Sequence, residues 1–452
     1  MITKLRAKNF KSWEDTGDLT FAPLTGLFGS NSSGKTSILQ MLLVLKQTAE
    51  STDPRRVLHT GDDRSLVDLG TFSDLIHSHA AGTALQLWLS WNLNEPLQIR
   101  DPESEDNVLF ETRELSFDTT ICEVEGRPAV ESFAYRFDNK SFGMVRRPAS
   151  NAKDKDRYDL VTQEYTPKRP VGRPWPLPNP IKCYGFPDEA IGYFQNTGFL
   201  PLLTLAFENA FSQVAYLGPL REHLKRTYIW AGDRPRDVGV RGDHAIPALL
   251  AARAAKLRTP KSTSLHSKSQ PIEERILQWL REMKAADSFS LKPIREDRKD
   301  YEFRVKTTGA SPEVLITDVG FGVSQLLPVL VLCYYVPRGS TVILEQPEIH
   351  LHPSIQATLA DVLIDVVKTR DVQVVVESHS EHLLRRLQRR IAEEAISPQD
   401  TALYFCKMGQ AASRIERLEV DMFGRISNWP PDFFGDELED LAAQTEAAAR
   451  RS

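Results

Sequence analysis

The hydrophobic pattern of the first fifty residues predicts strands and turns that give way to a buried helix. Apolar side chains recur along Ile2–Phe10 as in a half-buried strand, and Leu19–Ala22 and Gly26–Phe28 are short apolar runs of the same kind. A turn rich in glycine and serine follows. The segment Ser37–Gln47 (SILQMLLVLKQ) is apolar on most of its faces, which predicts a helix with little exposed surface.

The last third of the chain has the rhythm of a parallel α/β domain. Apolar strands are predicted at Thr341–Leu344, Val372–Val376 and Ala402–Cys406. The helices between and around them are predicted at Gln325–Tyr335, Ile355–Lys368 and His382–Ile391. Alternation of strands and helices is typical of a parallel sheet covered by helices.

The middle of the chain, from about residue 55 to 312, has a looser pattern. Aromatic and β-branched residues predict strands within Ala84–Leu93, Val108–Val124 and Ser132–Val145. Helical character returns near Thr197–Val214 and Glu273–Lys284. Since no internal repeat and no sustained heptad is visible, long coiled-coil arms are not expected. The simplest architecture is one domain whose two parts are separated in sequence by a long insertion.

Composition limits the choice of partners. The chain has 56 Lys and Arg against 61 Asp and Glu, a net charge of −5, so a nucleic acid would have to bind a local basic patch. Arg221–Lys268 is such a stretch. Its Lys and Arg residues fit a nucleic-acid-binding patch and a solvated protein surface equally well. No apolar run approaches the roughly 20 residues that span a bilayer. The four cysteines form no CxxC pair, and together these features predict a cytoplasmic protein with no membrane segment.

The strongest chemical signal is a phosphate-binding loop between the third strand and the first long helix. It consists of Gly29, Ser30, Asn31, Ser32, Ser33, Gly34, Lys35 and Thr36, with Ser37 after it. This sequence fits GxxxxGK[ST], whose backbone N–H groups and helix N-terminus bind phosphate oxygens. Lys35 is expected to reach the β- and γ-phosphates, and the Thr36 hydroxyl to ligate Mg²⁺. The predicted ligands are therefore ATP and Mg²⁺.

An apolar strand that ends in acids supplies the second half of such a site. The run TVILEQPE covers Thr341–Glu348, and a carboxylate at the carboxyl end of this strand would face the metal held by Thr36. Glu345 is the natural candidate for this metal ligand.

These motifs together resemble the ABC-type ATPases of the SMC/RecF group, and most closely the OLD (overcoming lysogenisation defect) branch. The resemblance is carried by the opening ITKLRAKNFKSW, the phosphate loop with Asn31, and the run ILEQPEIHLHP. Thr317–Gln325 is similar to the signature of that branch, and Val374–Ser380 to its H-loop strand. Tyr216–Glu222 resembles part of the insertion of bacterial members. The C-terminal GRISNWPPDFFGDELEDL resembles a terminal domain of unknown function.

The resemblance implies an α/β, ABC-type (SMC/RecF-like) fold with a mixed or parallel sheet, flanking helices and a long α+β insertion. The N-terminal ATPase part would cover residues 1–80, the insertion 81–312, the C-terminal ATPase part 313–395, and a C-terminal cap segment 396–452. OLD nucleases carry a Toprim domain after the ATPase. Only about 60 residues follow the last predicted ATPase helix, so no nuclease site is expected in this chain.

The resemblance also assigns roles to residues. Two copies of the chain would sandwich ATP, with Gly322, Ser324 and Gln325 of one copy closing over the γ-phosphate held by the other. His379 would be the switch histidine. One departure matters, because the usual Asp-Glu pair at the acidic strand end is Glu345-Gln346 here.

The amide of Gln346 can orient water but cannot accept its proton. Glu348 or His379 would then take that role, or hydrolysis would be slow.

Two functions follow as hypotheses. The first is an ATP-hydrolysing homodimer, or a higher oligomer, that controls an effector protein such as a nuclease or toxin encoded nearby, in defence against phage or foreign nucleic acid. The second is a RecF-like repair ATPase that acts directly on DNA.

Overall fold

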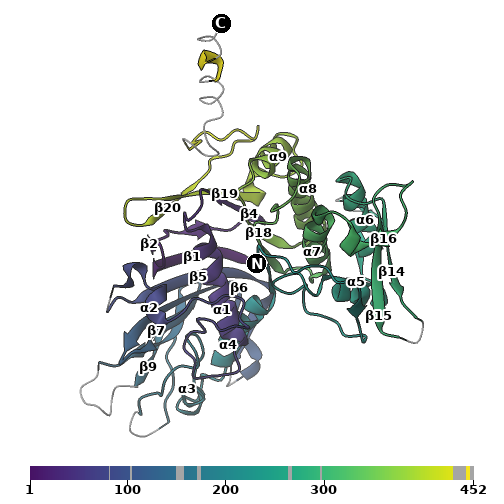
Figure 1. The fold of residues 1–452 in the computed structure, drawn as a ribbon. Helices are drawn as coiled ribbons and strands as arrows, with labels where there is room; N and C mark the ends of the chain where they lie inside the picture. The colour runs from purple at the N-terminus through teal and green to yellow at the C-terminus, as the bar shows by residue number, and fades with distance from the viewer. Residues whose placement is uncertain are drawn as a thin grey trace.

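The computed structural model describes residues 1–80, 82–101, 104–148, 157–170, 175–262, 267–295, 298–430 and 444–447. Two large sheets meet near the N-terminus, and a helical part with its own small sheet lies on the far side of helices α7, α8 and α9 (Figure 1). The predicted α/β architecture, with a largely parallel sheet and flanking helices, is confirmed.

The central sheet has six strands in the order β10-β17-β18-β4-β19-β20. Their bounds are β4 (Leu24–Gly29), β10 (Val214–Leu217), β17 (Thr341–Glu345), β18 (Gln373–Glu377), β19 (Thr401–Met408) and β20 (Ser413–Arg417). The first five in this order run parallel, and β20 pairs antiparallel with β19. Every residue of β4, β17 and β18 is buried, which explains their continuous apolar runs.

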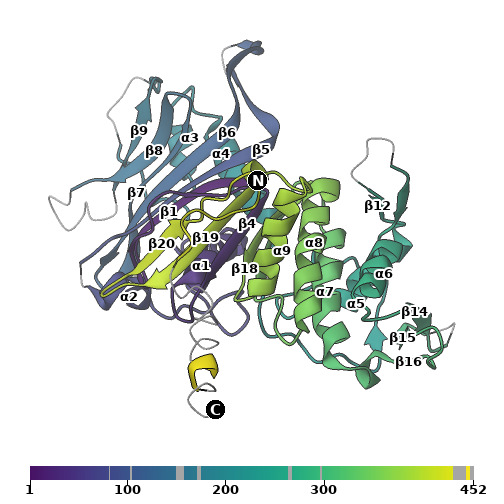
Figure 2. The same cartoon turned by 90° about the horizontal axis from the view of Figure 1, so that it is seen from above.

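Helices cover both faces of this sheet. On one face, Ile343 of β17 and Val375 of β18 share a core with α1 (Lys35–Glu50). On the other face, their neighbours Val342 and Val374 share a second core with three helices. These are α7 (Phe321–Tyr335), α8 (Pro353–Arg370) and α9 (Glu381–Ala392), which lie side by side in both views (Figures 1 and 2). The three predicted helices of the last third are confirmed within a few residues.

The second large sheet is antiparallel and has eight strands, ordered β2-β1-β5-β6-β7-β8-β9, with β3 also paired to β1. Their bounds are β1 (Ile2–Phe10), β2 (Trp13–Asp15), β3 (Leu19–Thr20), β5 (Leu85–Asp101), β6 (Ser104–Val124), β7 (Arg127–Phe137), β8 (Lys140–Arg146) and β9 (Tyr158–Gln163). Helix α4 (Leu200–Ser212) packs on it through aromatic contacts such as Trp91–Phe207. The strand-like segment Ser132–Val145 is a hairpin of β7 and β8 rather than one strand.

The sheets do not follow the expected division into ATPase parts and insertion. Strand β10 lies in the middle of the expected insertion 81–312, yet it is the edge strand of the central sheet and pairs with β17. Strand β5 likewise pairs along β1, so the first strands of the insertion extend the N-terminal sheet. Strand pairing depends on contacts distant in sequence, which the local pattern does not contain.

The remaining part is built on α5 (Ala245–Ala254) and α6 (Ile272–Glu282), which pack against α7. Its strands are β11 (Tyr228–Ile229), β12 (Arg258–Pro260), β13 (Ser269–Pro271), β14 (Ser288–Pro293), β15 (Asp300–Lys306) and β16 (Val314–Leu315). Short helices elsewhere are α2 (Phe72–Leu75) and α3 (Glu189–Gly192). Among the described residues, no helix is both long enough and apolar enough to cross a membrane.

Candidate functional site

The phosphate loop connects β4 to α1 and needs glycine at both of its ends. Gly29 has φ of 138°, and a Cβ there would overlap the carbonyl oxygen of Cys406 on the neighbouring strand. Gly34 has φ of 89° and is the N-cap of α1. Both positions therefore favour glycine, because an L side chain rarely adopts these angles.

The Lys35 ammonium is folded into this loop. It donates to the carbonyl oxygens of Gly29 at 3.1 Å and of Ser30 at 2.7 Å, and the residue is 3% exposed. Burial lowers the pKa of Lys35, and the Glu377 carboxylate opposes that shift. The lysine thus lies at the point where the loop would hold phosphate oxygens.

A cavity of about 290 Å³ opens over the loop. It is lined by Lys11, Ser12, Asn31, Ser32, Ser33, Gly34, Lys35, Thr36, Ser37, Gln346, Glu377 and His379. The structure therefore brings the predicted loop residues together with Gln346 and His379. Glu345 and Glu348 do not line this cavity.

Glu377 is a candidate site residue that the sequence analysis did not identify. It ends β18 and is 1% exposed, and its Oε1 accepts a hydrogen bond of 3.0 Å from the Thr36 hydroxyl. Burial and the neighbouring Glu345 raise the pKa of Glu377 to about 7, although Lys35 and Thr36 oppose the shift. A signal was present in the sequence, since Glu377 is the only charged residue in the buried strand QVVVE.

Glu345, the predicted metal ligand, is hydrogen-bonded toward β10, which lies on the opposite side of β17 from β18. Its Oε2 accepts a hydrogen bond of 2.7 Å from the Tyr216 hydroxyl of the edge strand β10. Burial raises the pKa of Glu345, while Tyr216 and the Arg221 guanidinium oppose that shift. The structure thus pairs Thr36 with Glu377 and pairs Glu345 with Tyr216.

Gln346 follows Glu345 in a left-handed conformation, with φ of 44°. A non-glycine residue in this region costs on the order of 1–2 kcal/mol. The conformation is held by the Gln346 backbone N–H, which donates to the Glu377 carbonyl at 2.9 Å. The amide side chain is thereby brought to the wall of the phosphate-loop cavity.

The signature residues Gly322, Ser324 and Gln325 lie in the first turn of α7, after the N-cap Gly320. None of them lines the cavity over the phosphate loop of the same chain. A helix N-terminus carries unpaired N–H groups and a partial positive charge. Within one copy, the phosphate loop and the N-terminus of α7 therefore do not share a cavity.

Comparison with known proteins agrees with this geometry. Residues 24–385 match the family described as "AAA domain, putative AbiEii toxin, Type IV TA system". The chain belongs to this family. Residues 396–444 match the family described as "Protein of unknown function (DUF3696)". No curated protein matches the chain.

Three solved SMC heads are similar to this AAA-domain family member. One is an SMC head bound to the C-winged helix domain of ScpA, with 12% identity and a TM-score of 0.47 over 93% of this chain and 98% of that chain. The SMC head domain from Thermotoga maritima has 12% identity and a TM-score of 0.42, over 93% of this chain and 99% of that chain. An Smc head with an extended coiled coil, bound to the C-terminal domain of ScpA derived from Pyrococcus furiosus, has 11% identity and a TM-score of 0.43, over 99% of each chain.

A P-loop ATPase of this family implies a nucleotide and Mg²⁺, and the residues present fit the metal. The Thr36 hydroxyl and the Glu377 carboxylate are oxygen ligands of the kind that Mg²⁺ prefers. Glu377 Oε2 is buried and makes no hydrogen bond to any described residue. No group of three His, Cys, Asp or Glu within the described ranges could hold a metal ion by itself. Nucleotide phosphates and water would therefore complete the coordination.

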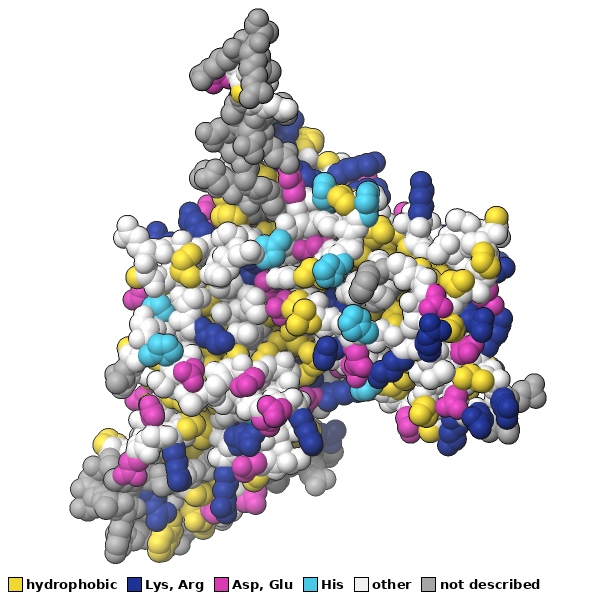
Figure 3. Space-filling view, viewed as in Figure 1, with side chains coloured by type: hydrophobic (Ala, Val, Ile, Leu, Met, Phe, Trp, Pro, Cys, Tyr) yellow, Lys and Arg dark blue, Asp and Glu magenta, His cyan; other side chains and the backbone are white. Residues whose placement is uncertain are grey.

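The basic stretch is largely engaged within the protein. Arg253 pairs with Glu273 at 2.9 Å and also donates to the Leu291 carbonyl. Arg258 donates to the hydroxyl and carbonyl of Ser269. On the face in Figure 3, Lys and Arg side chains lie among Asp and Glu side chains rather than in a continuous basic field. These contacts favour a structural role for this stretch over nucleic-acid binding.

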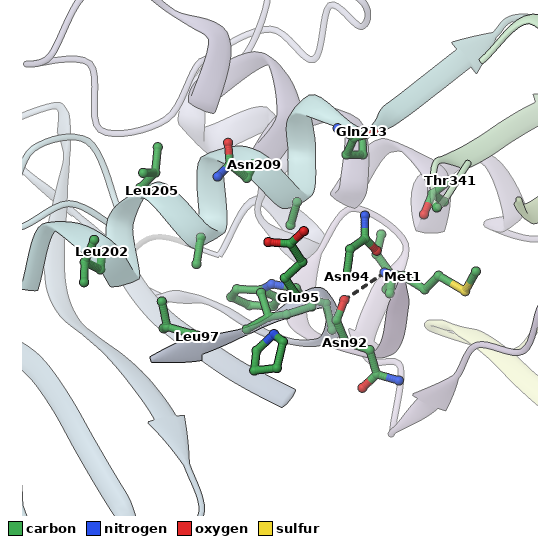
Figure 4. Close-up of a pocket in the computed structure, with 17 residues that line it drawn as sticks. Met1, Asn92, Asn94, Glu95, Leu97, Leu202, Leu205, Asn209, Gln213 and Thr341 are labelled. Atoms are coloured by element: carbon green, nitrogen blue, oxygen red, sulfur yellow. Dashed lines mark hydrogen bonds between the residues drawn. The ribbon is translucent and has the colours of Figure 1, made fainter. Parts of the chain in front are cut away.

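A second cavity, of about 380 Å³, lies at the opposite end of the central sheet, near Thr341 at the start of β17. Figure 4 shows Leu202 and Leu205 of α4 on one side and Asn92, Asn94 and Glu95 on the other. It contains none of the phosphate-loop residues.

Proposed function

We propose that this protein is an ATP-hydrolysing switch that works as a homodimer, or a higher oligomer, and controls a partner effector. The observation that carries the proposal is the separation of the two half-sites. One copy holds a phosphate loop with Lys35, Thr36 and Glu377, but its own signature turn at Gly322–Gln325 is absent from that cavity. A second copy would supply the turn, and two equivalent sites would form about a two-fold axis.

The residues around the cavity suggest how ATP would be bound and cleaved. Lys35 would exchange its bonds to loop carbonyls for bonds to the β- and γ-phosphates. The backbone N–H groups of the loop and the N-terminus of α1 would bind the remaining phosphate oxygens. Bound Mg²⁺ would neutralise charge that develops on the phosphates.

Gln346 and His379 are placed to act on the attacking water. The Gln346 amide can orient the water by hydrogen bonds. Burial and the nearby Lys35 lower the pKa of His379, so its imidazole is neutral at pH 7 and can accept a proton or donate to the γ-phosphate. The lack of a carboxylate at position 346 supports slow turnover and a long-lived ATP-bound dimer.

The partner is proposed to be a toxin or nuclease, and the setting defence against phage or foreign nucleic acid. The family description, which names a putative toxin of a type IV toxin–antitoxin system, supports this setting. We also propose that the protein is related to the OLD branch, which the sequence motifs resemble. Direct action on DNA is less favoured, because Arg253 and Arg258 are already bonded within the chain.

The test is ATP binding by Lys35→Ala, measured by isothermal titration calorimetry. Charge-assisted hydrogen bonds contribute about 1.5–3 kcal/mol each, so affinity should fall by at least about 10-fold. Lys4→Ala, which changes an exposed lysine of β1, is the matched control and should bind as wild type does. Equal affinity of Lys35→Ala and wild type would refute the nucleotide site.

A further inference from the structure

The order of strands decides which acid lies nearest the phosphate loop. Strand β18 lies between β4 and β17, and Glu377 is in register with Leu27 of β4 on one side and Glu345 of β17 on the other. Glu377 is therefore one strand from the phosphate-loop strand, and Glu345 is two strands away.

We propose that Glu377, rather than Glu345, is the carboxylate that holds Mg²⁺ together with Thr36. The inference rests on the proposed function, since it assigns a ligand of the same nucleotide site. Oε1 of Glu377 already contacts the Thr36 hydroxyl at 3.0 Å. Oε2 is buried without a hydrogen-bond partner among the described residues, and Glu377 lines the cavity.

The other two acids of this region do not line the cavity. Glu345 accepts the Tyr216 hydroxyl at 2.7 Å on the side of β17 away from the phosphate loop. Glu348 accepts hydrogen bonds from Ser378 and His379 through Oε1, and its Oε2, like that of Glu377, is buried without a hydrogen-bond partner among the described residues. Of the three, Glu377 is the one that lines the cavity and accepts from Thr36.

The experiment measures metal binding directly, by electron paramagnetic resonance of Mn²⁺ titrated into the full chain with ATP. Glu377→Gln keeps the shape of the side chain but removes its charge, and it should weaken Mn²⁺ binding by about 10- to 100-fold. Glu345→Gln is the matched variant on the neighbouring strand and should change Mn²⁺ affinity less than about 3-fold. Both variants should still bind ATP in EDTA.

The inference is overturned if Glu345→Gln loses Mn²⁺ affinity as much as Glu377→Gln does, or if Glu377→Gln binds Mn²⁺ as wild type does. Glu377→Asp retains the charge on a shorter side chain and should give an intermediate affinity, which tests the same point if the glutamine variant does not fold. Failure of the wild type to bind ATP both in EDTA and in the presence of the metal would instead refute the proposed function. The two failures are thus distinguishable.

Discussion

The Glu348 carboxylate accepts a hydrogen bond from the backbone N–H of His379 at 2.7 Å. The same oxygen accepts the Ser378 hydroxyl, also at 2.7 Å. Glu348 follows β17 and His379 follows β18, so these bonds fix the loops after two neighbouring strands against each other. Glu348 thereby holds the backbone of His379, which lines the cavity, whereas Glu348 itself does not.

Glu348→Gln should therefore retain most activity, whereas Glu348→Ala should lose it. The glutamine carbonyl can still accept from Ser378 and His379, but alanine leaves both donors buried and unpaired, at a cost of about 1–3 kcal/mol. Steady-state phosphate release and ATP affinity would be measured for both variants. We expect kcat to fall by about 10-fold or more in the alanine variant with little change in ATP affinity. A glutamine variant as inactive as the alanine variant would make Glu348 the base itself.

Gln346→Glu tests whether a missing base limits turnover. The Gln346 side chain lines the cavity, so glutamate there would place a proton acceptor at the attacking water. A general base contributes about 10²–10⁴-fold in rate, and an increase of at least about 10-fold in kcat is expected. Gln346→Ala removes both the amide and the charge and should slow the reaction. Fast turnover by wild type, together with a slower Gln346→Glu, would show that the native glutamine already completes a working site.

The phosphate loop and the helices of the last third were predictable because their signals are local. The motif Gly29–Thr36 is contiguous, and α8 and α9 follow strands with an unbroken apolar pattern. Their ends could be placed within a few residues because capping and periodicity are properties of neighbouring residues.

The acid that contacts the phosphate loop, Glu377, and the edge strand β10 could not be predicted in the same way. The sequence shows that Glu345 ends a strand, but not that β18 lies between this strand and the phosphate loop. Strand β10 is only four residues, Val214–Leu217, inside a long segment whose other strands belong to three other sheets. Both outcomes depend on strand order, which is set by packing between distant parts of the chain.

Gly322→Asp should abolish ATP-dependent dimerisation while leaving ATP binding intact. A Cβ at Gly322 would meet no atom within 4 Å, so the substitution fits a single copy. In the dimer the new carboxylate would face the γ-phosphate of the partner, and like charges at close range repel. Light scattering with a slowly hydrolysed ATP analogue would give the oligomeric state. Gly192→Asp, which also has open space around its Cβ, is the control and should dimerise. A dimer of Gly322→Asp with unchanged ATPase activity would contradict the composite site.

The buried carboxyl of Glu377 should make the metal-free protein less stable as the pH rises from about 5 to 8. Its pKa is raised from 4.5 in the unfolded chain to about 7 in the folded protein. Below pH 4.5 the carboxyl is protonated in both states, and its contribution to stability is fully present. Between pH 4.5 and about 7 the unfolded chain releases the proton but the folded protein retains it, so the free energy of unfolding falls as the pH rises. Above about pH 7 the carboxyl is ionised in both states, and its contribution to stability has been lost.

A shift of this size corresponds to about 3 kcal/mol. Glu377→Gln cannot ionise, so in EDTA it should be more stable than wild type by up to that amount at pH 8 and similar to it at pH 4.5. Urea unfolding at the two pH values would measure the difference, with the exposed Glu274→Gln of α6 as the control that should match wild type. A difference between Glu377→Gln and wild type that does not change with pH would mean that Glu377 is not held as a buried, high-pKa acid.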